Sequence, residues 1–256
     1  MKIVVLGKGG CGKSTISSIL AKNLAKNGLS VLVVDTDESN YGLHKQLGVG
    51  EPLELMDHLG GKKNLGNKLM KSMREGKPEA MSQMMGGQWT LSDIPENCLA
   101  RKDGVALMQI GKVKHFGEGC ACPMGALARS FLENLVVKDD EVVIVDTEAG
   151  VEHIGRGVEK GGDLVLMVVD PSYESLRLSG KVEAMLAEAN KPVFYVINKA
   201  DRETAEYLKG KLDASKVVTA FNSEPRLSRA GLSGREVTSR VSGAKQLTNF
   251  VMRRMG

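Results

Sequence analysis

Short apolar runs alternate with amphipathic stretches along most of the chain. Runs rich in Val and Ile predict buried strands at Lys2–Leu6, Ser30–Asp35, Glu141–Asp146, Asp163–Val169 and Pro192–Asn198, with further candidates at Val105–Ile110 and Val217–Phe221. Apolar residues three and four positions apart predict helices at Ser14–Asn27, Tyr173–Ala189 and Ala244–Met255. Strands that alternate with helices in this way predict an α/β fold, in which helices flank a doubly wound, mostly parallel sheet.

Residues 41–104 interrupt the alternation. This stretch is rich in Gly, Lys and Met and contains Trp89, the one tryptophan of the chain. We interpret it as short helices and a loop inserted between the second and third strands. Because no internal repeat or linker stands out elsewhere, a single domain over residues 1–256 is expected.

The composition is that of a globular protein, with 42% hydrophobic and 26% charged residues. The longest apolar run, Leu164–Val169, is far shorter than the ~20 residues that span a bilayer, so no membrane helix is expected. Lys and Arg number 35 and Asp and Glu 31, and this small surplus does not indicate a nucleic-acid-binding protein.

The first residues lead into a strand and lack the apolar segment of a signal peptide, so a cytoplasmic protein is expected. Four cysteines in a reducing compartment do not indicate a disulfide framework. They are expected to act, if at all, as thiols or metal ligands; they are Cys11, Cys98, Cys120 and Cys122.

A glycine-rich segment between the first strand and the first helix fits the pattern G-x-x-x-x-G-K-[ST] of a phosphate-binding loop. It comprises Gly7, Lys8, Gly9, Gly10, Cys11, Gly12, Lys13, Ser14 and Thr15. Glycines allow backbone N–H groups to converge on phosphates, and the following helix adds the positive end of its dipole. Lys13 is expected to neutralise the β- and γ-phosphates, and the Ser14 hydroxyl to coordinate Mg²⁺ bound with the nucleotide.

Two aspartates at the ends of predicted strands complete such a site. Asp146 ends the apolar run Val142–Val145 and is expected to support the Mg²⁺ ion. Asp37 follows the second strand and is expected to orient the attacking water. Aspartates at strand ends are also common turn residues, so each of them has a purely structural alternative.

Lys8 is not required by an ordinary phosphate loop. The string Lys8–Thr15 (KGGCGKST) resembles the deviant Walker A motif of the MinD, ParA and nitrogenase-iron-protein class of ATPases. That resemblance implies a nucleotide-sandwiched homodimer in which Lys8 reaches the phosphates bound by the partner subunit. The alternative is a solvated loop lysine.

The base could be adenine or guanine. The string Asn198-Lys199-Ala200-Asp201 matches the guanine-reading pattern N-K-x-D. In the MinD-like class, however, an Asn at the end of this strand contacts adenine without an Asp partner. The resemblance therefore favours ATP, with Asn198 and Lys199 on one side of the base and the loop Phe221–Pro225, including Pro225, on the other.

Cys120-Ala121-Cys122 is the second distinctive motif. The flanking Gly117, Gly119 and Pro123 predict a loop that places both sulfurs on one side of a turn. Two thiolates make half of a tetrahedral metal site, and a two-fold dimer would supply the other half. The alternative is a pair of inert cysteines.

Together, the deviant loop, the Cys120–Cys122 pair and the run Asp146–His153 (DTEAGVEH) resemble the CooC-type ATPases that insert nickel into carbon monoxide dehydrogenase. The resemblance implies an ATP-dependent homodimer that binds Ni²⁺ at Cys120 and Cys122, with that dehydrogenase as client. Four thiolates suit Zn²⁺ equally well. Cys11 and Glu38 stand where Val and Pro are usual, which leaves related factors for acetyl-CoA synthase as an alternative.

The same class of ATPases offers two alternative functions. A reductase like the nitrogenase iron protein holds its cluster with one cysteine before and one after the strand-end aspartate, and the segment Gly150–Gly157 contains no cysteine. A positioning or partitioning ATPase would need no metal. Some of its relatives end in a basic membrane-binding helix, whereas Leu247, Phe250 and Val251 are explained equally by a last helix that packs on the sheet.

Overall fold

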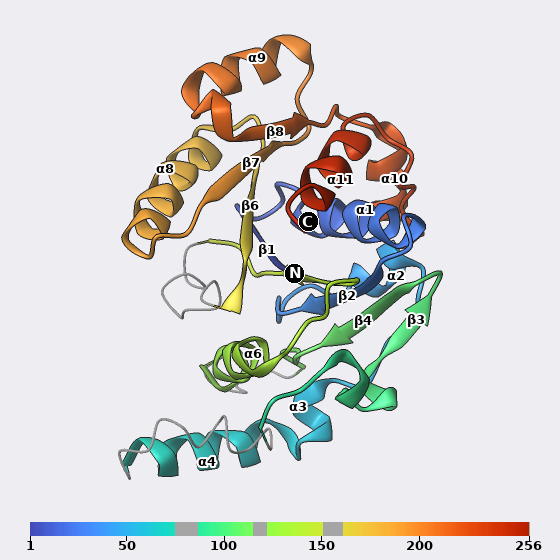
Figure 1. Cartoon of the computed structure of the whole chain (residues 1–256), viewed down its shortest axis with the longest axis vertical. Coiled ribbons are helices and arrows are strands. Elements are labelled where there is room, and N and C mark those ends of the chain that lie inside the picture. Colours follow the sequence, from blue (N-terminus) through green and yellow to red (C-terminus); the bar gives the residue numbers. More distant parts are fainter. Residues whose placement is uncertain (75–86, 115–121, 151–160, 256) are drawn as a thin grey trace.

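The computed structural model describes residues 1–74, 87–114, 122–150 and 161–255. Its strands form one sheet in the order β3-β4-β2-β5-β1-β6-β7-β8 (Figure 1). Every neighbouring pair is parallel except β3 and β4. The strands are β1 Lys2–Gly7, β2 Ser30–Asp35, β3 Ala100–Lys102, β4 Val105–Gln109, β5 Glu141–Asp146, β6 Leu164–Val169, β7 Val193–Ile197 and β8 Val217–Ala220. The predicted α/β fold with a mostly parallel sheet is confirmed.

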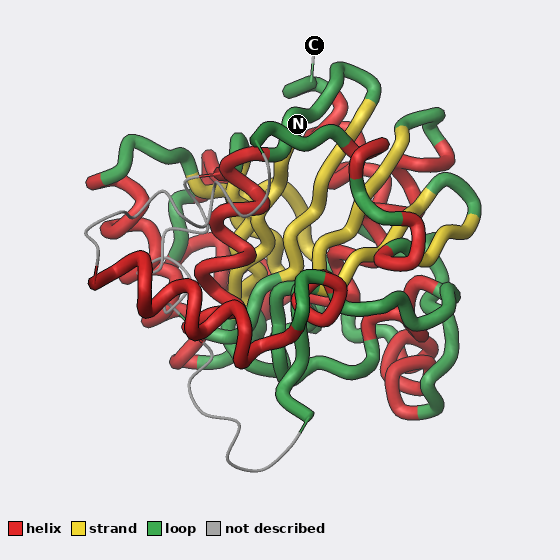
Figure 2. Tube along the Cα trace, turned by 90° about the horizontal axis from the view of Figure 1, so that it is seen from below, coloured by secondary structure: helices red, strands yellow, loops and turns green. Residues whose placement is uncertain are grey.

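Helices cover both faces of this sheet (Figure 2). The described α-helices are α1 Lys13–Lys26, α2 Leu43–Leu47, α3 Leu55–His58, α4 Gly61–Arg74, α6 Cys122–Asn134, α8 Tyr173–Glu188, α9 Arg202–Lys211, α10 Pro225–Leu232 and α11 Ala244–Met252. Three of them, α1, α8 and α11, correspond to predicted helices, and their ends differ from the prediction by at most three residues. The others were not predicted one by one; α2, α3 and α4 lie in the stretch 41–104, which was interpreted as short helices and a loop.

The two layers of helices require strands that are apolar on both sides. In β1, Ile3 and Val5 belong to the core on the α1 and α11 side, whereas Val4 and Leu6 belong to the core on the α6 side. All four side chains are at most 1% exposed. The alternation of side chains along a strand thus explains why the central strands carry continuous apolar runs.

The stretch 41–104 contains an edge strand that the sequence analysis missed. Besides α2, α3 and α4 it holds β3, which forms an antiparallel hairpin with β4. The turn is Asp103-Gly104, and both residues have positive φ, at 49° and 80°. Asp-Gly is a strong hairpin signal, and it was present in the sequence. Trp89 packs edge-on against Phe131 of α6, with ring centroids 6.1 Å apart.

The last helix packs on the sheet. Leu247 and Val251 of α11 are fully buried, and the Arg254 guanidinium lies 4.4 Å from the ring centroid of Phe194 and 3.7 Å from that of Phe250. The apolar face of α11 is therefore covered by the protein itself.

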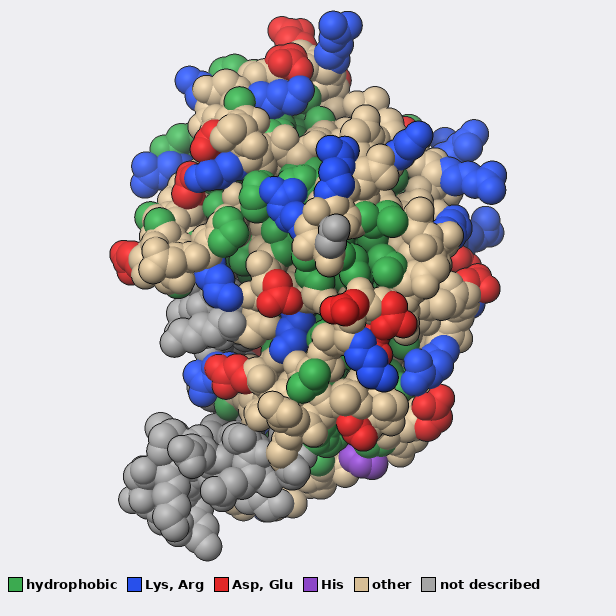
Figure 3. All heavy atoms as spheres, in the orientation of Figure 1, with side chains coloured by type: hydrophobic (Ala, Val, Ile, Leu, Met, Phe, Trp, Pro, Cys, Tyr) green, Lys and Arg blue, Asp and Glu red, His purple; other side chains and the backbone are tan. Residues whose placement is uncertain are grey.

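Across the described ranges, no helix is long and apolar enough to cross a membrane. Acidic and basic side chains are mixed around an apolar centre on the face seen in Figure 3.

Candidate functional site

The site lies at the carboxyl edge of the sheet, where β1, β5 and β2 end side by side. The connection from β1 to β2 runs toward the β3 edge of the sheet, and the connection from β5 to β6 runs toward the β8 edge. Ligands of open α/β sheets bind at such a switch point. The loop Gly7–Gly12 joins β1 to α1 there.

The phosphate loop has the backbone that its glycines permit. Gly10 and Gly12 adopt φ of 75° and 102°, in the left-handed region that side chains disfavour. Gly12 is the N-cap of α1, and no side chain caps this helix. The first N–H groups of α1 are thus available to an anion, and this fits a bound phosphate.

Lys13 and Ser14 lie at this helix end, as predicted for phosphate and Mg²⁺ contacts. The Lys13 side chain is buried, and its Nζ donates to the carbonyls of Gly7 and Lys8 at 3.3 Å each. Because these two hydrogen bonds are long, they satisfy the buried Lys13 ammonium only weakly. The ammonium is therefore suited to bind a polyanion such as a phosphate chain. Thr15 Oγ1 donates instead to Gln46 Oε1 at 3.2 Å.

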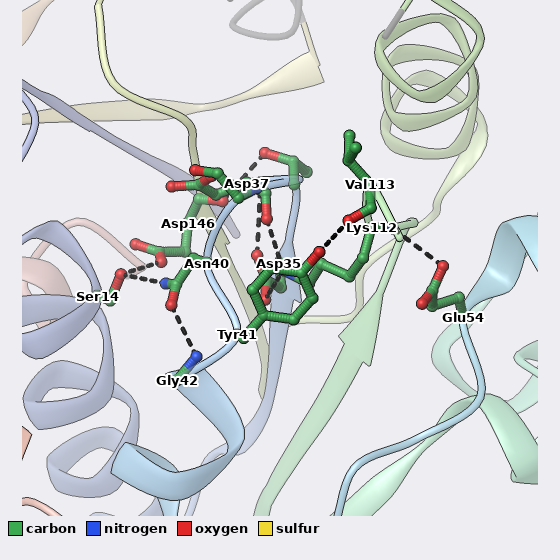
Figure 4. A network of polar contacts seen from close by, with 12 residues as sticks. Ser14, Asp35, Asp37, Asn40, Tyr41, Gly42, Glu54, Lys112, Val113 and Asp146 are labelled. Atoms are coloured by element: carbon green, nitrogen blue, oxygen red, sulfur yellow. Dashed lines mark hydrogen bonds and ion pairs between the residues drawn. The ribbon is translucent and has the colours of Figure 1, made fainter. Parts of the chain in front are cut away.

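Asp146 is the buried carboxylate behind Ser14 (Figure 4). Its two oxygens accept hydrogen bonds from Ser14 Oγ at 2.6 Å and Ser17 Oγ at 2.9 Å. Burial raises the pKa of Asp146, and the two hydroxyl donors oppose the rise. Asn40 Nδ2 also donates to Ser14 Oγ, at 2.8 Å. Asp146 therefore orients the hydroxyl that would hold Mg²⁺, and such an ion, once bound, would neutralise phosphate charge.

Asp37 lies on the wall of a cavity of about 500 Å³ that also includes Lys13 and Ser14. Its Oδ1 accepts from Ser39 N–H at 2.9 Å and Ser39 Oγ at 2.6 Å. Its backbone N–H donates to Asp35 Oδ1 at 3.1 Å. The turn thus holds Asp37 at the wall of the cavity that Lys13 and Ser14 also line.

The predicted base side of the cavity is partly assembled. Asn198 and Lys199 line it, together with Asn222, Glu224 and Leu227. Asn198 is buried and its Nδ2 donates to the Cys11 carbonyl at 2.8 Å, while Lys199 Nζ donates to the Gly10 carbonyl at 2.7 Å. These bonds connect the end of β7 to the phosphate loop.

Two residues named for the base differ in their structural role. Pro225 is the first residue of α10 and lies between the lining residues Glu224 and Leu227. Asp201 is the N-cap of α9, and its Oδ1 accepts from Thr204 N–H at 2.8 Å. One oxygen of the N-K-x-D carboxylate thus caps α9, and Asp201 is not among the described residues that line the cavity.

The Lys8 side chain lies beside the start of α8 in the same subunit. Its Nζ lies 3.6 Å from Asp170 Oδ2 and 3.9 Å from Glu174 Oε2, and the side chain is 28% exposed. Long, half-exposed ion pairs of this kind contribute little stability. The ammonium can therefore leave them at small cost.

The cysteines are placed only in part. Cys11 and Cys98 are buried and free, and burial raises the pKa of the Cys11 thiol to about 11. Cys120 lies outside the described residues, as does His153. Cys122 is the first residue of α6, so the loop predicted through Pro123 is wrong there: proline fits a first helical turn, which needs no N–H donor. The described residues contain no group of three His, Cys, Asp or Glu side chains that could hold a metal.

Four residues of the site escaped the sequence analysis as functional candidates. Ser17 and Asn40 bond the Asp146–Ser14 pair, and Lys112 forms an ion pair with Asp35 at 2.6 Å (Figure 4). Ser17 and Asp35 are polar residues within or next to apolar runs, and this pattern could have identified them as candidates. Nothing local distinguishes Lys112 from the other lysines of the chain.

Residues 2–234 match the family model of the CobQ/CobB/MinD/ParA nucleotide-binding domain. The chain therefore belongs to this family of P-loop nucleotide-binding proteins. An uncharacterized ATP-binding protein of Methanocaldococcus jannaschii is 44% identical over 251 residues, which is 98% of this chain and 99% of that protein.

Two further proteins show how far the similarity extends. The carbon monoxide dehydrogenase accessory protein CooC of Rhodospirillum rubrum is 35% identical over 204 residues, covering 78% of this chain and 74% of its own. The structure of MinD from Pyrococcus horikoshii in complex with Mg-ADP has a TM-score of 0.68 at 17% identity, covering 100% of this chain and 97% of that one. The latter likeness shows the fold.

Proposed function

We propose that this protein is a homodimeric ATPase that binds nickel through Cys120 and Cys122 and delivers it to carbon monoxide dehydrogenase. The observation that carries the proposal is the 35% identity to a CooC accessory protein in a chain that has the Cys120-Ala121-Cys122 motif. The nickel ion is cargo in this scheme.

The described residues support the ATPase half of the proposal. The uncapped N-terminus of α1, the buried Lys13 ammonium and the Ser14–Asp146 pair meet at one cavity, which fits a Mg²⁺–nucleotide complex. ATP is the proposed nucleotide because Asp201 caps a helix, and because the 44% identical relative is named an ATP-binding protein. Asp37 orients the attacking water.

The position of Lys8 supports the proposed dimerisation. Its ammonium is held outside the cavity by weak contacts to Asp170 and Glu174, whereas Lys13 serves the cavity from within. We infer that Lys8 exchanges these contacts for the phosphates bound to a second subunit. ATP binding would then close the dimer, bring two cysteine pairs together and complete a four-thiolate site. Nucleotide and metal would each strengthen the binding of the other to the closed dimer.

An anaerobic titration of the reduced protein with Ni²⁺ and Zn²⁺, with and without ATP, tests the metal half. We expect one ion per two chains, tighter binding with ATP, and loss of binding in Cys120→Ala/Cys122→Ala. Absence of tight binding in either nucleotide state would refute the chaperone function and leave a positioning or partitioning switch. Comparing the two metals shows which of them the four-thiolate site binds more tightly.

Lys8→Ala tests the dimer half. The variant should keep its affinity for ADP, because Lys13 and the loop backbone are untouched, but lose ATP-induced dimerisation and most turnover. Arginine fingers acting in the same manner contribute on the order of 10³-fold or more to hydrolysis. Glu174→Gln is the matched control, because it loses one Lys8 contact and leaves the lysine in place.

A further inference from the structure

The chain after β4 runs beside the segment after β2, beyond the end of the sheet. Ile110 N–H donates to the Asp35 carbonyl at 3.0 Å, and Val113 N–H donates to the Glu38 carbonyl at 3.2 Å. The Tyr41 hydroxyl donates to the Val113 carbonyl (Figure 4). These bonds join residues 110–113 to the segment that carries Asp37.

Lys112 lies in the middle of this contact. Its side chain is 2% exposed, and its Nζ donates to Asp35 Oδ2 at 2.6 Å and to the Asp37 carbonyl at 2.5 Å. The Asp35 side chain is fully buried. Removing two charges from water is unfavourable, and such a pair is often no more stabilising than apolar residues of the same volume. Stability alone is thus a poor explanation for this ion pair.

The geometry of the pair offers a better explanation. Asp35 Oδ1 accepts the Asp37 N–H at 3.1 Å, while Lys112 Nζ donates to the carbonyl of the same residue. Both backbone polar groups of Asp37 are therefore held by one buried ion pair. The Asp37 side chain then has little freedom, because Ser39 binds its Oδ1 through both N–H and hydroxyl.

The far side of Lys112 is fixed as well. Its backbone N–H donates to Glu54 Oε2 at 2.9 Å, and Glu54 Oε1 lies 2.9 Å from Lys114 Nζ. Lys114 also pairs with Asp57 of α3 at 2.7 Å. Lys112 thus connects the base of α3 to the wall of the nucleotide cavity, whereas Lys114 binds the same elements from the surface.

We propose that Lys112 is a positioning residue for ATP hydrolysis, which holds Asp37 at the rim of the nucleotide cavity from a strand extension 75 residues away in sequence. This inference rests on the proposed ATPase function and deepens it. Lys112 touches neither the phosphate loop nor the Ser14–Asp146 pair in the contacts described above. Its loss should therefore impair turnover more than nucleotide binding.

Lys112→Met/Asp35→Asn is the variant of choice. Lys112→Met alone would leave a buried carboxylate without its counter-ion and could prevent folding, whereas the double variant removes both charges and keeps an amide oxygen for the Asp37 N–H. Lys114→Met is the matched control. It also removes a lysine that binds Glu54 and Asp57, but the Lys114 side chain is 43% exposed, whereas that of Lys112 is buried.

We expect the double variant to lose at least about tenfold in kcat for ATP, since small misplacements of a catalytic group have effects of this size or larger. Its KM for ATP and its Kd for ADP should change less than about twofold. Lys114→Met should match the wild type. A folded double variant with wild-type kcat, or one whose kcat loss is accompanied by an equal loss of ADP affinity, would overturn the proposal.

Hydrogen exchange gives a second measurement that does not depend on activity. In the nucleotide-free protein, peptides covering residues 35–41 should exchange faster in the double variant than in the wild type or Lys114→Met. Unchanged exchange there would refute the positioning role even if the protein hydrolysed no ATP. A wild type without ATPase activity but with the expected exchange difference would instead refute the proposed function alone.

Discussion

Gly12 of the phosphate loop lies directly against Asn198 on the base side of the cavity. Its φ is 102°, and a Cβ added there would collide with Asn198 Nδ2. That amide is buried and donates to the Cys11 carbonyl at 2.8 Å. Gly12→Ala therefore imposes two separate costs, one on the backbone and one on the Asn198 hydrogen bond.

The magnitude follows from these two costs. A left-handed backbone costs a residue with a Cβ about 1–2 kcal/mol. Displacing Asn198 from its buried acceptor costs about 1–3 kcal/mol. Gly12→Ala should lower the free energy of unfolding of the nucleotide-free protein by about 2–5 kcal/mol, measured by urea denaturation followed by circular dichroism.

Gly10→Ala is the internal control. Gly10 has a φ of 75°, but nothing lies within 4 Å of an added Cβ, so only the backbone cost of about 1–2 kcal/mol applies. In a double-mutant cycle, Gly12→Ala and Asn198→Ala should show coupling, because removing the amide removes the collision. Equal losses for the two glycine variants, together with additive effects in the cycle, would refute the reasoning.

Three further outcomes follow from buried groups. The Cys11 thiol, whose pKa burial raises to about 11, should resist iodoacetamide at pH 7.5 until the protein unfolds; rapid alkylation of the native protein, mapped by mass spectrometry, would contradict its burial. Ser17→Ala should destabilise the protein by about 1–3 kcal/mol in urea denaturation and raise the pKa of Asp146 further, because it removes one of the donors to that buried carboxylate. Burial raises the pKa of Asp35 to about 7, although Lys112 opposes the rise, and this pKa lies above that of an aspartate in the unfolded chain. The unfolded chain therefore releases this proton at a lower pH than the folded protein does. As the pH rises from about 4 to about 7, the free energy of unfolding should fall by up to about 1.4 kcal/mol per pH unit. Asp35→Asn should flatten this slope, and an unchanged slope in urea denaturation at pH 5, 6 and 7 would disprove the assignment.

Much of the fold could be predicted because its signals are local. Central strands such as β1 and β6 must be apolar on both faces. Each of these two strands has six residues, and its continuous apolar run is visible in that short stretch of sequence. The phosphate loop could be predicted as well, since the glycines, Lys13 and Ser14 act within one turn between a strand and a helix.

Some elements were missed although the sequence carried signals for them. The edge strand β3 has three residues, and its hairpin signal Asp103-Gly104 lies in a stretch dominated by other patterns. The start of α6 at Cys122 was predicted as loop, because glycines on one side and Pro123 on the other favour a turn. Proline in a first helical turn satisfies the same local preference. Asp201 likewise matched a nucleotide motif and instead caps α9.

The sequence by itself determined the apolar strands and the glycine loop that carries Lys8, Lys13 and Ser14, because each of these depends on neighbours a few residues away. Only the tertiary structure decided which distant residues share the site. Ser14 meets Asp146 across 132 positions, and Lys112 meets Asp35 across 77. Both pairings depend on the strand order, which places β5 between β1 and β2 and β4 beside β2. Strand order results from packing the whole sheet between its helices, and no local pattern encodes it.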